Sequence, residues 1–428
     1  MVLALFFLPS VSWYVWRRLF RDTTAAPGRT RRAGAVALLA ANLVTLGALA
    51  TERTDAPFWL QRLLAWPGFL WMALSIYLLL AMLAGELVRP VLRRLLSPRA
   101  RQKTSAALPA PRPEPEPAAV FRAERSETVP ARPAPATPEP GPDEQGVGPD
   151  TEPGAGPSRR LFVSRVVAGA AAAAAVGTVG AGTYGVLRGP RVKRVTVPLA
   201  KLPRAAHGYR IAVVSDIHLG PVLGRGFAER VVDTINATQP DLVAVVGDLV
   251  DGSVKDLGPA AAPLRGIQAP AYFVTGNHEY FSGAEQWVEE IRRLGLLPLE
   301  NARTELPFFD LAGVNDVAGE REGQGPDFAR ALGDRDTTRA CVLLAHQPVQ
   351  VHDAVEHGVD LQLSGHTHGG QLWPGYLLAA AANPTVAGLE RYGDTQLYVS
   401  RGAGTWGPPT RVGAPSDITV IQLASARA

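Results

Sequence analysis

Five of the eight histidines in this chain lie in short polar motifs between residues 211 and 369. The motifs are Asp216-Ile217-His218, Gly247-Asp248-Leu249-Val250-Asp251, Gly276-Asn277-His278-Glu279, Ala345-His346-Gln347 and Gly365-His366-Thr367-His368. Carboxylate, imidazole and amide oxygen ligands suit manganese, iron or zinc. Two such divalent ions, about 3.5–4 Å apart, can generate a hydroxide nucleophile and stabilise charge on a phosphoryl group. The motifs therefore predict a two-metal site for phosphoester hydrolysis.

Each motif follows a short apolar segment that has the character of a buried strand. The segments are 210–215, 241–246, 271–275 and 341–345, with a weaker one at 360–364. Continuous runs of Val, Ile and Leu suit strands that are buried on both faces, as in parallel sheets. Ligands gather beyond the carboxyl ends of such strands. We therefore expect the five motifs to meet at one edge.

The candidate ligands can be divided between two ions. We expect Asp248 to bridge the ions, because its motif lies between the other two N-terminal motifs. The first ion would also be held by Asp216, His218 and His368, and the second by Asn277, His346 and His366.

Three further residues are candidates for other roles in the site. His278 stands beside a ligand and would donate a proton or hydrogen bond to the leaving oxygen. Asp251 would orient a histidine. Arg401 could line a phosphate or headgroup pocket together with Trp406 and Arg411, or it could have a structural role in the last strands.

The motifs resemble those of the calcineurin-like metallophosphoesterase superfamily, which read D-x-H, G-D-x-x-D, G-N-H-D/E, H and G-H-x-H. Every position of this pattern is present in order, and the resemblance covers residues 195–428. It implies an α/β fold, a sandwich of mixed β-sheets flanked by helices such as 226–237 and 283–294, and the ligand roles given above. Segments 365–374 and 398–409 resemble the membrane-anchored bacterial branch grouped with UDP-diacylglucosamine pyrophosphatase-like enzymes.

Two neighbouring classes of phosphatase fit the motifs less well. Ser/Thr protein phosphatases of this fold read G-D-x-V-D-R-G, whereas here Asp251 is followed by Gly252 and Ser253. The arginine that would grip the phosphate is therefore missing. Purple acid phosphatases place a tyrosine ligand three residues after the bridging aspartate, where this chain has Asp251.

Composition divides the 428 residues into four regions. Apolar runs at 2–16, 33–50 and 63–85 predict about three transmembrane helices, because about 20 apolar residues cross a bilayer. A segment rich in Pro, Ala, Glu and Gly cannot bury enough apolar surface to fold and is expected to be a disordered linker. The regions are a membrane region at 1–103, the linker at 104–157, a signal or transmembrane helix at 158–188 and the catalytic domain at 195–428.

The start of the third region resembles a twin-arginine export signal. Ser158-Arg159-Arg160-Leu161-Phe162 precedes a run rich in Ala and Gly at 166–187. The alternative is an ordinary fourth membrane helix.

Arginines indicate an orientation for these helices. They are concentrated at 17–32 and 89–103, which the positive-inside rule places in the cytoplasm together with the linker. A fourth span would then carry the catalytic domain to the outer face of the cell membrane. Four basic residues just beyond that span run against the rule: Arg188, Arg191, Lys193 and Arg194.

Net charge and cysteine content add little. The net charge of +4 is explained by arginines that flank the membrane segments, so no nucleic-acid partner is expected. Cys341 is the single cysteine and lies in an apolar strand, which predicts a buried, inert thiol. The oligomeric state is not determined by these features.

We therefore expect a membrane-anchored, two-metal hydrolase of phosphoester or pyrophosphate bonds, including those of lipid-linked substrates. Two alternatives remain open. One is a non-catalytic membrane protein with a structural metal site, and the other is a cytoplasm-facing nucleotide phosphodiesterase. The presence of His278 favours the enzyme, and the four expected spans favour membrane-associated substrates.

Overall fold

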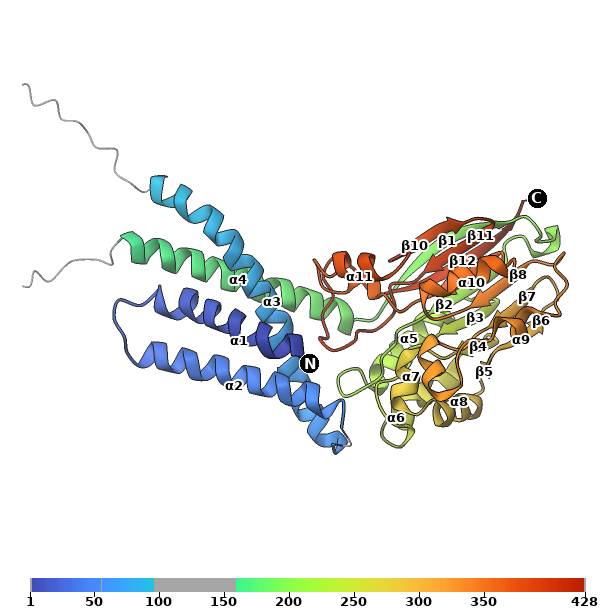
Figure 1. Cartoon of the computed structure of the whole chain (residues 1–428), viewed down its shortest axis with the longest axis horizontal. Coiled ribbons are helices and arrows are strands. Elements are labelled where there is room, and N and C mark those ends of the chain that lie inside the picture. Colours follow the sequence, from blue (N-terminus) through green and yellow to red (C-terminus); the bar gives the residue numbers. More distant parts are fainter. Residues whose placement is uncertain (1, 55, 96–158, 427–428) are drawn as a thin grey trace, which may run out of the picture.

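A computed structural model describes residues 2–54, 56–95 and 159–426. The linker expected at 104–157 lies outside these described residues. Four helices form a bundle at one end of the molecule, and an α/β domain lies at the other (Figure 1). The helices are α1 (Val2–Trp16), α2 (Arg29–Thr51), α3 (Phe58–Leu95) and α4 (Arg159–Leu187).

Three helices of the described chain are long and apolar enough to cross a membrane. They cover Arg29–Thr51, Phe58–Leu92 and Arg160–Leu187, and thus include the apolar runs expected at 33–50, 63–85 and 166–187. The run at 2–16 also forms a helix, α1, but its 15 residues fall short of the roughly 20 that cross a bilayer.

Small and polar residues hold the bundle together. A Cβ at Gly68 of α3 would lie 2.9 Å from that of Ala48, so glycine permits the close approach of α2. The hydroxyl of Thr45 donates to the carbonyl of Gly68 over 2.9 Å. Asn42 donates to Ser12 of α1 over 2.8 Å, so the same helix also binds its other neighbour.

One end of the bundle is rich in arginine, and the α/β domain lies at the other end. The turn between α1 and α2, the end of α3 and the start of α4 all lie away from the domain (Figure 1). At this far end Arg18 pairs with Asp22 and Glu86 over 2.8 and 3.0 Å. Arg165 of α4 donates to the carbonyl of Thr23 over 3.0 Å. The arginine-rich segments are therefore gathered on one side.

The α/β domain is built on two six-stranded sheets. The first has the order β1-β12-β2-β3-β4-β5 and the second β10-β11-β9-β8-β7-β6. The strands of the first sheet are β1 (Arg191–Leu199), β2 (Arg210–Val214), β3 (Leu242–Val246), β4 (Ala271–Val274), β5 (Leu297–Pro298) and β12 (Asp417–Ser425). Those of the second are β6 (Ala302–Glu305), β7 (Asp310–Gly313), β8 (Cys341–Leu344), β9 (Leu361–Ser364), β10 (Gly388–Tyr392) and β11 (Thr395–Val399).

The two sheets pack face to face, and helices cover their outer faces. Ile211 and Val246 of the first sheet share one buried core with Val342 and Leu363 of the second. The helices of the domain are α5 (Arg225–Ala237), α6 (Val254–Ala261), α7 (Asn277–Ser282), α8 (Ala284–Arg293), α9 (Phe328–Leu332), α10 (Val351–Glu356) and α11 (Tyr376–Ala382). Helices α5, α6 and α8 pack on the first sheet, and α9 and α10 pack on the second.

The predicted sandwich of mixed sheets flanked by helices is confirmed. The five expected strands correspond to β2, β3, β4, β8 and β9, and β2–β3–β4 and β7–β8–β9 are parallel. They belong to two sheets, however, because β8 and β9 pair with β7 and β11 and not with β4. The motifs therefore meet where the carboxyl ends of two sheets adjoin. Cys341 is buried, as expected.

Candidate metal centre

The turns after β2, β3 and β9 hold five candidate ligands in the left-handed region of the backbone. Among the described residues, eight non-glycine residues have positive φ, and five of them carry these side chains. Such conformations are uncommon and persist where the surrounding structure enforces them, at a cost of about 1–3 kcal/mol each. The five are Asp216, His218, Asp248, His366 and His368, with φ of 52°, 48°, 52°, 72° and 52°.

Gly247, just before Asp248, allows the turns to approach one another. Its φ is 78°, and a Cβ there would lie 2.6 Å from the backbone nitrogen of Gly276 and 2.7 Å from Nδ1 of His346. Any larger residue at position 247 would therefore push its turn away from the turns that carry Gly276 and His346. The glycine that opens this motif is a packing requirement of the site.

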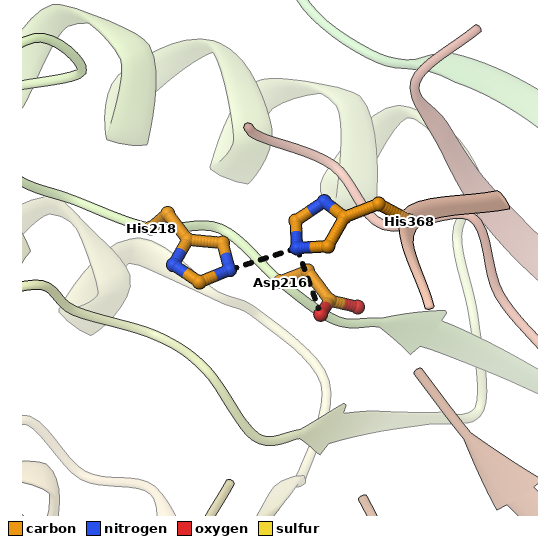
Figure 2. A group of neighbouring side chains, drawn as sticks. All are labelled: Asp216, His218 and His368. Carbon is orange, nitrogen blue, oxygen red and sulfur yellow. Dashed lines mark hydrogen bonds and ion pairs between the residues drawn. The ribbon is translucent and has the colours of Figure 1, made fainter. Parts of the chain in front are cut away.

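We define the first cluster as Asp216, His218 and His368 (Figure 2). The Nε2 atoms of the two histidines face each other at 3.0 Å, and Nε2 of His368 lies 3.4 Å from Oδ1 of Asp216. Their ligand atoms all lie within 4.8 Å of one another. All three side chains are buried. Two nitrogens and an oxygen thus converge on one buried point.

We define the second cluster as Asn277, His346 and His366. Oδ1 of Asn277 lies 2.9 Å from Nδ1 of His366. His346 donates through Nδ1 to the carbonyl of Val246, at the end of β3, over 2.8 Å. This bond turns the buried Nε2 of His346 toward Oδ2 of Asp248, which lies 3.1 Å away. A buried imidazole whose Nδ1 is bound to the backbone and whose Nε2 faces a carboxylate fits a metal ligand.

Asp248 stands between the two clusters. Its Oδ2 lies 3.1 Å from Nε2 of His346 and 3.6 Å from Nε2 of His218. Burial would raise the pKa of Asp248, but the charge and hydrogen bond of His346, together with the charges of His278 and His218, hold it well below its usual range. Burial would likewise lower the pKa of His346, but the Asp248 carboxylate holds it well above. Without ions, the site therefore holds a carboxylate, Asp248, beside a positively charged imidazole, His346. A cation bound between them could replace the proton on His346.

Glu279 fixes the turn that carries Asp248, a role that sequence reasoning did not assign. Its carboxylate accepts from the backbone nitrogens of Asp248, Leu249 and Gly276 over 3.0, 2.8 and 2.6 Å. It occupies the third position of α7, where a glutamate commonly reaches back to the helix start. The position of Glu279, three residues after Gly276 at the helix start, could have indicated this role in the sequence.

The arrangement of donors is consistent with a site for two divalent ions. Nitrogen and oxygen donors surround Asp248 on both sides, and no thiolate is present in either cluster. Oxygen and imidazole donors suit manganese, iron or zinc, so the residues fit the group that their chemistry implies. A buried site of this kind could hold ions that supply charge and an activated water.

His278 and Asp251 form a hydrogen-bonded pair beside the first cluster. Oδ1 of Asp251 accepts from Nδ1 of His218 over 2.8 Å and lies 2.7 Å from Nδ1 of His278. Burial would lower the pKa of His278, but Asp251 outweighs burial and raises it to about 9. His278 also groups with His218 and Asp248 within ligand distance, so proximity alone does not separate it from the ligands.

The two arginines named from the sequence lie in different surroundings. Arg411 is buried, and its guanidinium donates to the carbonyl of His368 over 2.9 Å and lies 3.0 Å from Nδ1 of that ring. It supports the first cluster from behind, and its guanidinium is held by hydrogen bonds within the domain. Arg401 is half-buried, with Nη1 4.0 Å from Asp417, and its role stays a prediction.

Aromatic residues and a loop of the bundle lie near the site. The rings of Trp406 and Phe281 lie 5.9 and 5.5 Å from that of His278. Between α2 and α3, burial of the Glu52 carboxyl and, after it, the charge of Asp251 raise the pKa of Glu52 to about 7. Nothing in the sequence indicated that this membrane-region loop approaches Asp251.

Comparison with known proteins agrees with this geometry. The family model for calcineurin-like phosphoesterases matches residues 209–370, which include both clusters. A transmembrane protein with metallophosphoesterase domain from Danio rerio is 39% identical over 254 residues, covering 55% of this chain and 58% of that protein. The chain thus spans little more than half the length of this relative.

Two bacterial relatives are covered more fully. An uncharacterized metallophosphoesterase from Helicobacter pylori is 36% identical over 272 residues, covering 62% of this chain and 73% of that protein. Another from Bacillus subtilis is 30% identical over 283 residues, covering 63% of this chain and 98% of that protein. With its metal-ligand clusters and these relatives, the chain is a metallophosphoesterase and belongs to the calcineurin-like phosphoesterase family.

Proposed function

We propose that this metallophosphoesterase hydrolyses phosphoester or pyrophosphate bonds of membrane-associated substrates, with Asp248 bridging two ions. The first ion is assigned to Asp216, His218 and His368, and the second to Asn277, His346 and His366. Two divalent ions supply the nucleophile and stabilise phosphoryl charge. The proposed domain limits are those predicted from composition: 1–103, 104–157, 158–188 and 195–428.

His278 is assigned as the proton donor in this reaction. A water that has lost one proton to solvent forms a bond from its oxygen to phosphorus while the bond to the leaving oxygen breaks. His278 gives its proton to that leaving oxygen and regains a proton from solvent. Asp251 supports this role because its carboxylate accepts from Nδ1 and leaves Nε2 to face the substrate. The hydrogen bond and charge of Asp251 oppose the effect of burial, raise the pKa of His278 and favour the protonated ring that this role requires.

The connection between the rim of the site and a membrane helix carries the substrate assignment. Trp406, which lies beside His278, accepts through its carbonyl from Gln371 over 3.0 Å. Trp373, which lies two residues after Gln371, accepts through its carbonyl from Tyr77 of α3 over 3.0 Å. The rim of the site is thus bound to a helix that is apolar enough to cross a membrane. A substrate in that membrane would meet the site at high effective concentration.

Helix α11 presents apolar side chains on the same side of the domain. Leu377 and Leu378 are 69% and 78% exposed, and Trp373 and Tyr376 just before them are also exposed. The helix lies close to the end of α4 that adjoins the domain (Figure 1). Amphipathic aromatics and leucines at this level favour the headgroup region of a bilayer. We therefore assign a lipid-linked substrate, as in the UDP-diacylglucosamine pyrophosphatase-like branch.

Turnover on matched substrates tests this assignment. The full-length protein in mixed micelles with manganese should hydrolyse a lipid phosphodiester or pyrophosphate roughly a hundredfold faster than the water-soluble ester of the same headgroup. Replacing Leu377 and Leu378 by serine should lower turnover on the lipid alone. The matched control is Leu297→Ser, an exposed leucine of β5. Equal turnover on both esters, or a preference for a phosphopeptide or a soluble nucleotide, would contradict the proposal.

We also propose that the α/β domain lies outside the cytoplasm. The far end of the bundle gathers Arg18, Arg31, Arg89 and Arg165, which supports a cytoplasmic position for that end. Replacing Arg159 and Arg160 by lysine should leave the domain inside if the twin-arginine route carries it. A C-terminal alkaline phosphatase fusion, which is active only outside the cytoplasm, provides the measurement. An inactive fusion on the unaltered protein would refute the orientation.

A further inference from the structure

A cavity of about 330 Å³ lies where α4 adjoins the α/β domain, apart from the metal clusters. One wall is formed by Thr178, Ala181, Gly182 and Gly185 of α4. These small residues have the spacing of one helix face, so together they leave a shallow groove along α4. The opposite wall includes residues of the segment 411–416.

The cavity is a built feature of the fold, because its two walls are fixed to each other. The side chains of Thr183 and Thr410 share a buried hydrogen bond of 2.7 Å. A Cβ at Gly182 would lie 2.7 Å from the carbonyl oxygen of Arg411, so α4 and the segment are in close contact there. One turn further along, nothing lies within 4 Å of a Cβ placed at Gly185. The groove therefore opens toward the domain end of α4.

Two arginines that have no acidic partner among the described residues line this cavity. Arg188 and Arg191 are exposed, and in the described part of the chain neither side chain has an acidic partner. Arg411 also lines the cavity, but its guanidinium is bound to His368 and to the carbonyls of Gly404 and Ala414. No acidic residue is among the lining residues. The cavity is therefore positively charged without an internal counterion.

Ser416 supplies an independent sign of a ligand. It lines the cavity and is 5% exposed, yet its Oγ has no hydrogen-bond partner among the described residues. A buried hydroxyl without a partner is destabilising by about 1–3 kcal/mol. A ligand with an acceptor oxygen would satisfy it. Two guanidiniums and a hydroxyl together suit a phosphate group.

We propose that this cavity binds one anionic phospholipid. Its phosphate would lie between Arg188 and Arg191 and accept from Ser416, and an acyl chain would follow the small-residue face of α4. The position at the end of an apolar helix selects a lipid phosphate over a free one. The site does not depend on the substrate of the metal centre. It also gives a role to basic residues that run against the positive-inside rule.

Native mass spectrometry of the full-length protein, titrated with phosphatidylglycerol or phosphatidylcholine in micelles, tests the proposal. One phosphatidylglycerol should bind tightly, and Arg188→Gln and Arg191→Gln should each weaken it roughly fivefold. Arg194→Gln removes a neighbouring exposed charge that does not line the cavity and should have little effect. Equal losses in all three variants would indicate diffuse charge and overturn the site.

A second pair of variants tests the groove without changing charge. Gly185→Leu should block the acyl chain and abolish tight binding. Gly180→Leu is the matched control, since a Cβ there also meets nothing within 4 Å and Gly180 does not line the cavity. Turnover of a water-soluble ester reports that both variants are folded. Unchanged lipid binding in the Gly185 variant, or full displacement of the lipid by an equal concentration of glycerol phosphate, would overturn the proposal.

Discussion

The two clusters of the metal centre are supported in different ways. The first cluster depends on side chains from elsewhere in the fold, because Asp251 accepts from His218 and Arg411 contacts His368. The second cluster is bound to the backbone of the first sheet, since His346 donates to the carbonyl of Val246. A backbone carbonyl is unaffected by substitution, whereas a supporting side chain can be lost. The first cluster should therefore be the more easily perturbed half of the site.

Arg411 makes this difference larger. It directly follows Thr410, which is hydrogen-bonded to Thr183 of α4, and its guanidinium lies 3.0 Å from Nδ1 of His368. An arginine donating there leaves the proton of a neutral ring on Nε2, the nitrogen that faces His218. Asp251 and Val246 have the opposite effect on His218 and His346, because they accept from Nδ1. Of the two histidines of the first cluster, His368 is thus the one whose ring must change its hydrogen bonding to bind a cation through Nε2.

The largest effect should come from Asp248→Asn, which removes the carboxylate shared by both clusters. Turnover should fall by at least about 10⁴-fold, because metal-ion charge stabilisation supplies several kcal/mol of the rate and 1.36 kcal/mol is tenfold. Both ions should be absent by inductively coupled plasma mass spectrometry. Asp233→Asn, at an exposed position of α5, is the control. A variant that retains two ions would show that Asp248 is not shared.

A smaller effect is expected for His278→Ala, which belongs to neither cluster as defined. General acids contribute about 10²–10⁴-fold, so turnover should fall at least about a hundredfold while both ions remain. Metal analysis and turnover on the same sample provide the measurement. The loss should be smaller for esters with a good leaving group, which need less protonation. Loss of an ion from this variant would move His278 into the first cluster.

Asp251→Asn should weaken ion binding at the first cluster and leave the second cluster unchanged. Without the carboxylate that accepts from Nδ1 of His218, affinity for the ion of the first cluster should fall about 10–100-fold. The second ion should be unaffected. Titration of the metal-free protein with manganese, followed by calorimetry, would resolve the two sites. Asp256→Asn, an exposed residue at the start of α6, is the control. An equal loss at both sites would refute the difference between the clusters.

The smallest effect concerns Cys341, which begins the strand that leads to His346. Burial raises the pKa of this thiol to about 12, so the reactive thiolate is scarce at neutral pH and alkylation of the folded protein should be very slow. Asp251→Asn should leave the alkylation rate unchanged, because the second cluster stays intact. Iodoacetamide labelling read by mass spectrometry tests this. Faster labelling of Cys341 in Asp251→Asn than in the unaltered protein would contradict it.

Local sequence was sufficient to predict the strands and the motifs that follow them. Residues such as 242–246 form a continuous apolar run, and the polar residues after it are adjacent in the chain. The division of these strands between two sheets could not be predicted, because it depends on pairing with β7 and β11. The contact of Arg411 with His368 spans 43 residues and has no local signal. The role of Glu279, in contrast, could have been recognised from helix-capping spacing.

The membrane region was predicted less completely. Apolar length identified three helices that are able to cross a membrane. It did not indicate that the turn between α2 and α3 brings Glu52 near Asp251, since that depends on how the bundle docks on the domain. Nor did the sequence show that α11 exposes Leu377 and Leu378. Exposure depends on how the molecule packs, and an apolar segment of seven residues can equally be buried.

The meeting of two sheets at the metal centre also bears on how the protein unfolds. His218 follows a strand of one sheet and His368 a strand of the other, 150 residues along the chain. An ion held by both closes a long loop, as a disulfide would, but with a bond that a chelator can remove. Its binding free energy then adds to the free energy of unfolding. Bound ions would therefore add to the coupling that the shared hydrophobic core already gives the two halves of the sandwich.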